Sequence, residues 1–569
     1  MSLLNNILRK KTIDDALTNS SAESEHGGGL NKNLGVIDLT ALGVAAIIGT
    51  GVLSTIGKAI YFGGPSVVWL YFFTAVACGF SALCYAQFAS TVPISGSAYT
   101  YSYITFGELL AWLVGWNLLM EYAIGNIAVA ISWSDYFTGL MSGLGWDISP
   151  HWTMDYLTAS RMAADPANAS AAALEAWKNA PQIGGFRLIA DIPALTMTVL
   201  ITALVYIGIR ESKIVGNVMV AIKLAIVLAV ILTGIFYINP ANWSPFSPNG
   251  VSGVMKGMAA VFFAYIGFDA LSTMAEECKD PRRDLPRSMF WSLLICTILY
   301  VAVVLVLTGL TSYKNFATEN PLTGALDVKG DPLAFVFEEH GLHLFAGVIA
   351  FSAVIAIAAV FMVFQLGQPR IWMTMSRDGL LPKRFGKIHP RFKTPAFATI
   401  ITGLLVAIPA LFLNLTEVTD LCSIGTLFAF AMVCGGILVM DAKGQGSEAK
   451  FKVPFFNSRY WLPAALLLVM GGIYLFDHNG LSKLVACPDG SCHDQYPFYA
   501  FLAGLVILTT LAIYRQWSFV PTMGLILNVF MMSQLGWTNW VRFIVWIGVG
   551  LVIYFGYSYT HSKLAKREG

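Results

Sequence analysis

Long apolar stretches recur along almost the whole chain and limit what it can fold into. A helix crosses a bilayer core about 30 Å thick with about 20 apolar residues. Charged residues make up 12% of the 569 residues, whereas ordinary soluble domains carry about 25%. The pattern therefore predicts an all-α polytopic membrane protein with about fourteen spans. These lie near residues 36–62, 65–91, 107–141, 192–209, 214–236, 252–275, 288–310, 343–369, 395–414, 418–440, 460–476, 497–514, 519–535 and 540–560.

The charges of the loops predict how the chain is oriented. Lys and Arg accumulate in the cytoplasmic loops of membrane proteins. With the N-terminus inside, the inside loops and the final tail hold Arg210, Lys213, Lys279, Arg282, Arg283, Arg287, Arg377, Lys383, Arg384, Lys387, Arg391, Lys393, Lys443, Lys450, Lys452, Arg459, Lys563, Lys566 and Arg567. The bias predicts a multi-pass protein of the cell (inner) membrane with cytoplasmic tails at 1–35 and 561–569. Residues 1–35 contain no apolar run after their basic residues, so they are no secretory signal. A net charge of +2 gives no reason to expect nucleic acid as a partner.

Two polar segments fall on the predicted outer side. Residues 142–191 are rich in Ala, Asn and Pro, and we expect a folded lid or a family-specific insertion. The motif CPDGSC places Cys487 and Cys492 around a Pro-Asp-Gly turn, which favours a disulfide in an oxidising space. A metal site with His478 or His493 is the weaker alternative, because zinc ligands usually come at tighter, paired spacing. The other six cysteines lie in apolar spans and are expected to be packing residues.

A weak point in the first predicted span needs a physical reason. Gly49-Thr50-Gly51 stands inside an otherwise apolar helix, although each glycine costs about 1 kcal/mol of helix propensity relative to alanine. A dinucleotide-binding fingerprint is excluded, because its third glycine would be needed where Ser54 stands. Close packing of helices through small residues is the ordinary alternative.

The sixth span contains a second weak point. Its sequence AVFFAYIGFDALSTMAEE starts at Ala260 and places Gly267 and Asp269 at mid-depth. The first and sixth spans are five apart, so they cross the membrane in opposite directions. Interrupted helices at corresponding places in two halves indicate an inverted-repeat transporter with its site at the midplane. Backbone N–H groups freed by the breaks attract an anion and freed carbonyls attract a cation, so the pattern favours a free amino acid as ligand.

Several motifs in order resemble one transporter family. They are IIGTGVL in the first span, WNLLMEYAIGNIAVA from Trp116, GIRES from Gly208, NVMVAIKLAIV from Asn217, FFAYIGFDALSTMAEE from Phe262, KDPRRDLPRS from Lys279 and MSRDGLLPKRF from Met375. Together they resemble the amino acid–polyamine–organocation (APC) superfamily, in the branch of the cationic amino acid transporters (CAT) and their bacterial relatives. The resemblance covers roughly residues 33–441. Neither residues 142–191 nor the CPDGSC loop fits the family's pattern, so no role is transferred to them.

The resemblance implies a 5+5 inverted-repeat fold of the LeuT-like (APC) type, working by alternating access. The first repeat would be 36–236 and the second 252–441, followed by four additional helices at 459–560. The substrate carboxylate would meet the backbone N–H groups of the first break, and the ammonium would meet carbonyls of the second. Carried over to this chain, the substrate-binding residues are Ile48, Gly49, Thr50, Gly51, Phe263, Ala264 and Ile266, with Tyr265 and Phe268 as gates.

Three ionisable residues inside the spans are candidates for proton coupling. Lys223 lies roughly 14 Å from the start of its span and Glu121 roughly 20 Å from the start of its own, so both approach the bilayer centre. Desolvation favours the neutral form of an unpaired ammonium, which lets it load and release a proton. The resemblance implies that Lys223 takes the place of sodium in sodium-coupled relatives, with the proton as coupling ion and no cofactor. The alternatives are that Lys223 is the fixed partner of a buried acid, and that Glu121 and Asp269 are structural acceptors.

The substrate and the transport mode are less constrained. The eighth span, AVIAIAAVFMVFQLGQ from Ala353, is apolar until Gln365. We therefore expect small neutral or hydrophobic L-amino acids, with cationic ones still possible if Asp269 or Glu121 projects into the pocket. An exchanger and a transporter-fold sensor are the alternative functions, whereas no metalloprotease or hydrolase motif supports an enzyme. Glu276 and Glu277 are expected to pair with the basic loop behind them. Besides membrane lipid, an accessory single-span subunit or a homo-oligomer remains open.

Overall fold

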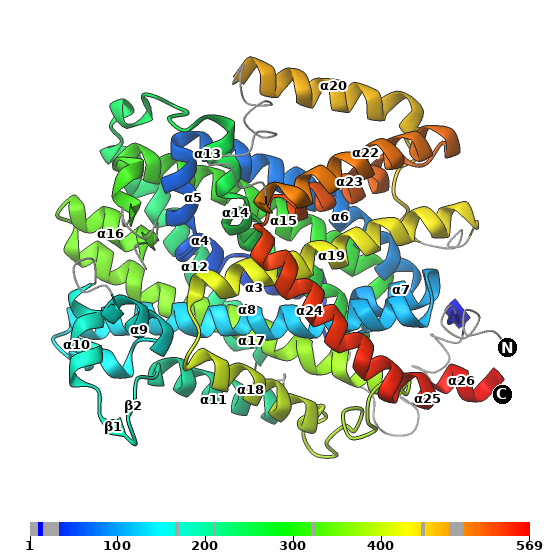
Figure 1. Cartoon of the computed structure of the whole chain (residues 1–569), viewed down its shortest axis with the longest axis horizontal. Helices are drawn as coiled ribbons and strands as arrows, with labels where there is room; N and C mark the ends of the chain where they lie inside the picture. Colours follow the sequence, from blue (N-terminus) through cyan, green and yellow to red (C-terminus); the bar gives the residue numbers. More distant parts are fainter. Residues whose placement is uncertain are drawn as a thin grey trace.

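The computed structural model describes residues 9–14, 33–164, 170–208, 212–319, 326–328, 331–444, 450–476 and 493–568. Over these residues the regular secondary structure is helical, apart from two short antiparallel hairpins. One hairpin pairs β1 (Gln182–Ile183) with β2 (Phe186–Arg187), and the other pairs β3 (Ala317–Glu319) with β4 (Leu326–Val328). Many of the long helices lie side by side along one common direction, and both termini lie at the same end of the bundle (Figure 1).

The described helices account for each of the fourteen predicted spans. Ten of them are long and apolar enough to cross a membrane, and four shorter apolar helices accompany them. The first half contains α3 (Val36–Ile47), α4 (Thr50–Leu53), α5 (Ile56–Gly63), α6 (Val67–Thr91), α7 (Ser97–Thr105), α8 (Glu108–Gly143), α11 (Ile192–Ile207) and α12 (Ser212–Gly234). The second half contains α13 (Gly250–Lys256), α14 (Met258–Tyr265), the 3-10 helix η6 (Asp269–Glu277), α15 (Pro281–Leu310), α16 (Pro332–Glu339), α17 (His343–Arg377), α18 (Ala396–Ala410) and α19 (Leu415–Ala442). The last part contains α20 (Ser458–Phe476), α22 (Tyr496–Arg515), α23 (Phe519–Ser533), α24 (Trp537–Ile553), α25 (Tyr559–His561) and α26 (Lys563–Glu568).

Three extensive helix–helix contacts organise the bundle. Helix α17 packs along α8, and α15 packs along both α6 and α3. Of the last four spans, α23 packs against α19 and α6, whereas α20, α22 and α24 bury few of their side chains. The broken first and sixth spans are therefore enclosed by continuous helices, because the long helices that flank them supply the packing they cannot supply themselves.

The segment that follows α8 contains folded elements of its own. It contains the 3-10 turn η3 (Pro150–Trp152), α9 (Tyr156–Ala164), α10 (Ala171–Asn179) and the β1–β2 hairpin. Ala159, Ala180 and Ile189 form a small separate core with Trp177 packed against it. This folded segment lies at the end of the bundle remote from both termini (Figure 1). The motif with Cys487 and Cys492 lies outside the described residues, and the other six cysteines are buried and free.

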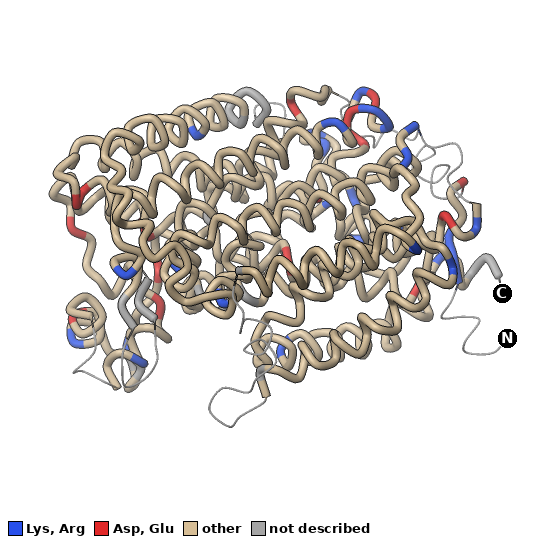
Figure 2. Tube along the Cα trace, turned by 90° about the horizontal axis from the view of Figure 1, so that it is seen from above, with Lys and Arg blue, Asp and Glu red and all other residues tan. Residues whose placement is uncertain are grey.

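Two features near the end that carries the termini were not predicted from the sequence. Helix α7 is entirely buried, although its residues SAYTYSYIT gave no apolar span. The first described residues also dock on the bundle: Lys11 forms a 2.6 Å ion pair with Asp378, and Glu108 N donates to Arg9 O at 2.9 Å. Figure 2 shows Lys and Arg gathered at the end that carries both termini, with few charged residues along the middle of the helices.

Candidate functional site

The first span is broken at the glycines, as the sequence predicts. Helix α3 ends at Ile47, and Ile48 is extended, with φ −75° and ψ 99°. The chain bends at Gly49 and then forms the four-residue helix α4. Because the first N–H groups of a helix have no acceptor inside it, the backbone donors at the start of α4 are available to another group.

The sixth span is broken as well. Helix α14 ends at Tyr265, Ile266 is extended with ψ 138°, and Gly267 has a φ of +125°. This conformation favours glycine, because a side chain would clash with its own backbone. A Cβ atom at Gly267 would also lie 2.8 Å from Ala46 Cβ, so the glycine lets the two broken spans approach closely.

The two breaks lie against each other. A Cβ atom at Gly51 would lie 2.2 Å from Ala264 Cα, which is too close for any side chain without a movement of backbone. Tyr300 of α15 lies between the breaks, since its hydroxyl is 2.7 Å from Ile47 O and 2.9 Å from Ala264 O and its one proton is shared between these two carbonyls. Thr55 adds a bond to Gly51 O at 2.8 Å.

Tyr300 was not among the residues singled out from the sequence. The sequence offered one signal: Tyr300 is the only tyrosine in the predicted seventh span, and buried tyrosines usually find a partner for the hydroxyl. The sequence could not indicate which carbonyls Tyr300 meets.

Lys223 lies at the first break. It projects from α12, is 2% exposed, and its Nζ donates to Ala45 O at 2.9 Å and also to Ile48 O. Among the described residues its partners are these two carbonyls, so the alternative that it serves as the partner of a buried acid finds no support there. The C-terminal end of a helix attracts positive charge, because its last carbonyls carry a partial negative charge.

Asp269 and Glu121 are both fully buried, but they are placed differently. Asp269 Oδ1 accepts a 3.3 Å hydrogen bond from Gly267 N and thus braces the second break. Its Oδ2 and both carboxyl oxygens of Glu121 have no partner among the described residues, and neither have the hydroxyls of Tyr85 and Tyr122. The two carboxyl groups are close enough to interact electrostatically. Buried polar groups without partners are costly, about 1–3 kcal/mol each, and are typical of functional sites.

The two predicted gate residues are held in aromatic clusters. Tyr265 donates to Tyr71 O at 3.1 Å, and its ring packs edge-on against Tyr300 with centroids 5.3 Å apart. Phe268 packs against Phe430 at 4.9 Å and against Tyr85. Both side chains are buried, so either would have to move before it could open or close a path.

An apolar helix faces the first break. A Cβ atom at Gly49 would lie 2.4 Å from Val360 Cγ2 of α17, which places Val360 directly against the break. The stretch of α17 around Val360 is buried and apolar. This environment suits an apolar side chain better than a charged one, because a buried charge requires a partner.

Ion pairs join η6 to α17 on the side of the site that faces the termini. Arg370 Nε donates to Glu277 Oε1 at 2.9 Å in a buried pair, and Arg377 pairs with Glu276 at 3.3 Å. The expectation that Glu276 and Glu277 pair with the basic loop behind them is therefore wrong. Packing brings α17 against η6, and its arginines reach the carboxylates instead.

Comparison with known proteins gives the family. Residues 34–476 match the model described as amino acid permease, and residues 518–562 match the model described as the C-terminus of AA_permease. The chain is 35% identical over 558 residues to the branched-chain amino acid permease BcaP of Bacillus subtilis (strain 168), covering 98% of this chain and 99% of that protein. It is also 35% identical over 564 residues to the methylthioribose transporter of the same organism, covering 99% and 100%.

A plant relative extends the comparison. Cationic amino acid transporter 3, mitochondrial, of Arabidopsis thaliana is 29% identical over 633 residues, covering 99% of this chain and 96% of that protein. These matches span the broken helices and the last four spans alike, and all are to transporters rather than enzymes. The chain thus belongs to the amino acid permease family, as a multi-pass transporter of the APC superfamily in its cationic amino acid transporter branch.

Proposed function

We propose that this amino acid transporter is a proton-coupled symporter of neutral L-amino acids, with hydrophobic side chains preferred. One observation carries the proposal: two broken helices meet inside the bundle, and a buried lysine contacts the first of them. A zwitterion fits such a pair of breaks, because one offers backbone donors and the other offers carbonyls.

The substrate ends would bind to the backbone. The substrate carboxylate would accept hydrogen bonds from the backbone amides of Gly49, Thr50 and Gly51. Ile48, which precedes them, would form the remaining part of this side of the binding site. The ammonium would donate to the carbonyls at the second break, which belong to Phe263, Ala264 and Ile266. One carbonyl oxygen can accept two hydrogen bonds, so the bond from Tyr300 to Ala264 leaves room for a second donor.

The proton would act through Lys223. A protonated lysine makes charge-assisted bonds to Ala45 O and Ile48 O, and these are stronger than bonds from a neutral amine. Loss of the proton would therefore loosen the first break, where the carboxylate is proposed to bind. Glu121 and Asp269 are further candidates to take up a proton, because both are fully buried and their carboxyl groups interact electrostatically.

The preference for apolar side chains is supported by Val360 and by the apolar stretch of α17 around it. The name of BcaP, a branched-chain amino acid permease, points the same way. Since a methylthioribose transporter is equally similar to this chain, methylthioribose is the natural competitor to include in a substrate screen.

For the orientation, we propose that both termini lie in the cytoplasm of a cell in whose plasma membrane the protein resides. The clustering of Lys and Arg at the terminal end of the bundle supports this (Figure 2). Protease access to tags at the two termini in sealed cells tests it, and cleavage without permeabilisation would contradict it.

Uptake into proteoliposomes tests the transport proposal. Labelled leucine is expected to accumulate when the outside is made acidic, and to stop accumulating when a protonophore is added. An exchanger would need internal amino acid and would not respond to the gradient, whereas a sensor would bind leucine without accumulating it.

A lysine variant tests the role of Lys223. Lys223→Gln is expected to abolish gradient-driven accumulation, whereas Lys279→Gln, in an exposed loop, is expected to leave it intact. Accumulation at the wild-type rate in Lys223→Gln would contradict the proton role even if leucine transport itself were confirmed.

A further inference from the structure

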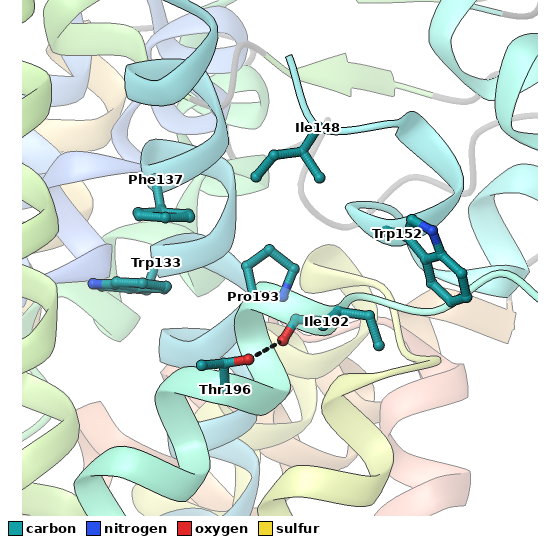
Figure 3. Close-up of a pocket in the computed structure, with 7 residues that line it drawn as sticks. All are labelled: Trp133, Phe137, Ile148, Trp152, Ile192, Pro193 and Thr196. Carbon is teal, nitrogen blue, oxygen red and sulfur yellow. Dashed lines mark hydrogen bonds between the residues drawn. The ribbon is translucent and has the colours of Figure 1, made fainter. Parts of the chain in front are cut away.

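An apolar pocket lies where the helices end remote from the termini, and the proposed transport mechanism does not use it. The cavity measures about 480 Å³. Helix α8, the segment after it and the start of α11 form its walls, and Figure 3 shows the side chains around the open space. They are Trp133, Phe137, Ile148, Trp152, Ile192, Pro193 and Thr196.

The polar groups that α8 and α11 contribute to the lining are already hydrogen-bonded within the protein. Thr196 Oγ1 donates to Ile192 O of its own helix at 2.9 Å (Figure 3), and Trp133 Nε1 donates to Val354 O at 3.0 Å. None of the lining side chains is charged. A zwitterionic amino acid would therefore lose the hydration of both charged ends without compensation, which excludes it as the occupant.

The mouth of the pocket continues into the exposed face of α11. Ile192 and Thr196 line the pocket, and the positions one turn further along the same face are Val199 and Leu200, which are 55% and 61% exposed. Residues spaced by three or four positions share one side of a helix. In a membrane-spanning bundle, such an exposed apolar face contacts lipid chains, so the pocket opens towards lipid.

The link between α8 and the folded segment points to the same surroundings. Its apolar residues Leu144, Trp146 and Ile148 are 66%, 73% and 38% exposed. Asp147 between them is tied to Ser142 by a 2.6 Å hydrogen bond. Exposed tryptophan is typical of the membrane–water interface, and a contiguous exposed apolar patch marks a contact surface. This link therefore lies at the level of the lipid headgroups, with Ile148 over the pocket.

We propose that the pocket takes one acyl chain of a phospholipid from the adjacent leaflet and so anchors residues 142–191 to the membrane surface. The chain enters between α8 and α11 and ends against Trp133 and Phe137, whose rings stack 4.8 Å apart. The headgroup stays at the interface beside Trp146.

Photolabelling in proteoliposomes tests the proposal. The probe is a phosphatidylethanolamine with a diazirine near the end of one acyl chain, and the adducts are mapped by mass spectrometry. Adducts are expected on the peptides that contain Trp133–Phe137 and Ile192–Thr196. Thr196→Trp, which fills the pocket, is expected to remove most of them.

Ile207→Trp is the matched control, because it places the same bulky side chain on the same exposed face of α11 about three turns from Thr196, away from the mouth of the pocket. It is expected to keep the adducts, and both variants are expected to retain leucine uptake. Equal labelling in wild type and Thr196→Trp, or labelling spread evenly along α11, would overturn the proposal. Labelling by a diazirine fatty acid but not by the phospholipid would also overturn it, since the occupant would then be a free fatty acid.

Discussion

Gly51→Ala is the smallest change that tests whether the two breaks must touch. The added methyl group would lie 2.2 Å from Ala264 Cα, 2.7 Å from its Cβ and 2.9 Å from its nitrogen. Because two of these atoms are backbone, no rotation of a side chain relieves the contact. Ordinary contact begins at 3.4 Å, so the two segments would have to separate by about 1.2 Å (3.4 minus 2.2).

The size of the effect follows from the cost of overpacking. Inserting a methyl group into a well-packed interior typically costs about 1–3 kcal/mol. If the protein relieves this by parting the breaks, the proposed donors and acceptors for the substrate move apart by the same distance. Leucine could then bind in the proposed way only by bringing the breaks together again, against the same cost of about 1–3 kcal/mol. Since each 1.4 kcal/mol changes an equilibrium constant tenfold, leucine binding is expected to weaken roughly 5- to 140-fold.

Binding is measured on purified protein by the leucine-dependent shift of the thermal unfolding midpoint, and by the concentration that half-saturates uptake. The matched control is Gly79→Ala in α6, where the added Cβ would meet only Leu293 Cδ2, at 3.9 Å. Both variants make the same chemical change in a membrane-spanning helix. A Gly51→Ala protein that binds leucine as tightly as Gly79→Ala would refute the idea that the substrate depends on this close approach.

Two further predictions concern Tyr300, which bonds to both breaks, and the buried ion pair between Glu277 and Arg370. Tyr300→Phe removes the one hydroxyl proton that Ile47 O and Ala264 O share, at a cost of about 1–3 kcal/mol. Its unfolding midpoint in detergent should fall well below that of Tyr71→Phe, whose hydroxyl has no partner among the described residues, and equal midpoints would count against the bridging role. Glu277→Leu should destabilise by about 3–5 kcal/mol because it leaves Arg370 buried and uncompensated. The double variant with Arg370→Met should regain most of that loss, and a double variant as unstable as the single one would contradict the pairing.

The positions of the spans and the two breaks could be predicted because they depend on local sequence. Each span needs only its own apolar residues, and Gly49, Gly51 and Gly267 weaken a helix wherever they stand. Lys223 could be placed at the depth of the breaks, because the rise per residue of a helix is fixed. None of these inferences requires knowledge of which helices are neighbours.

The partners of these residues could not be predicted, because they depend on packing between distant segments. Tyr300 lies 36 residues after Ala264 along the chain, yet its hydroxyl joins both breaks. Glu277 binds Arg370 of α17 rather than a basic residue nearby in sequence, because η6 packs against α17. Helix α7 is polar enough to suggest a loop, but its burial between other elements overrides that composition.

The contact of Lys223 with carbonyls rather than with an acid bears on how coupling would work. A carboxylate partner would keep the lysine charged at all times, because the pair stabilises both charges. Carbonyls at the end of α3 carry only partial charge, so they bind the ammonium but stabilise its charge less than a carboxylate would. They also belong to the break itself, since Ile48 connects α3 to Gly49. A proton on Lys223 and a substrate at the first break would therefore act on the same three or four peptide groups. Coupling between proton and substrate then requires no contacts beyond these groups.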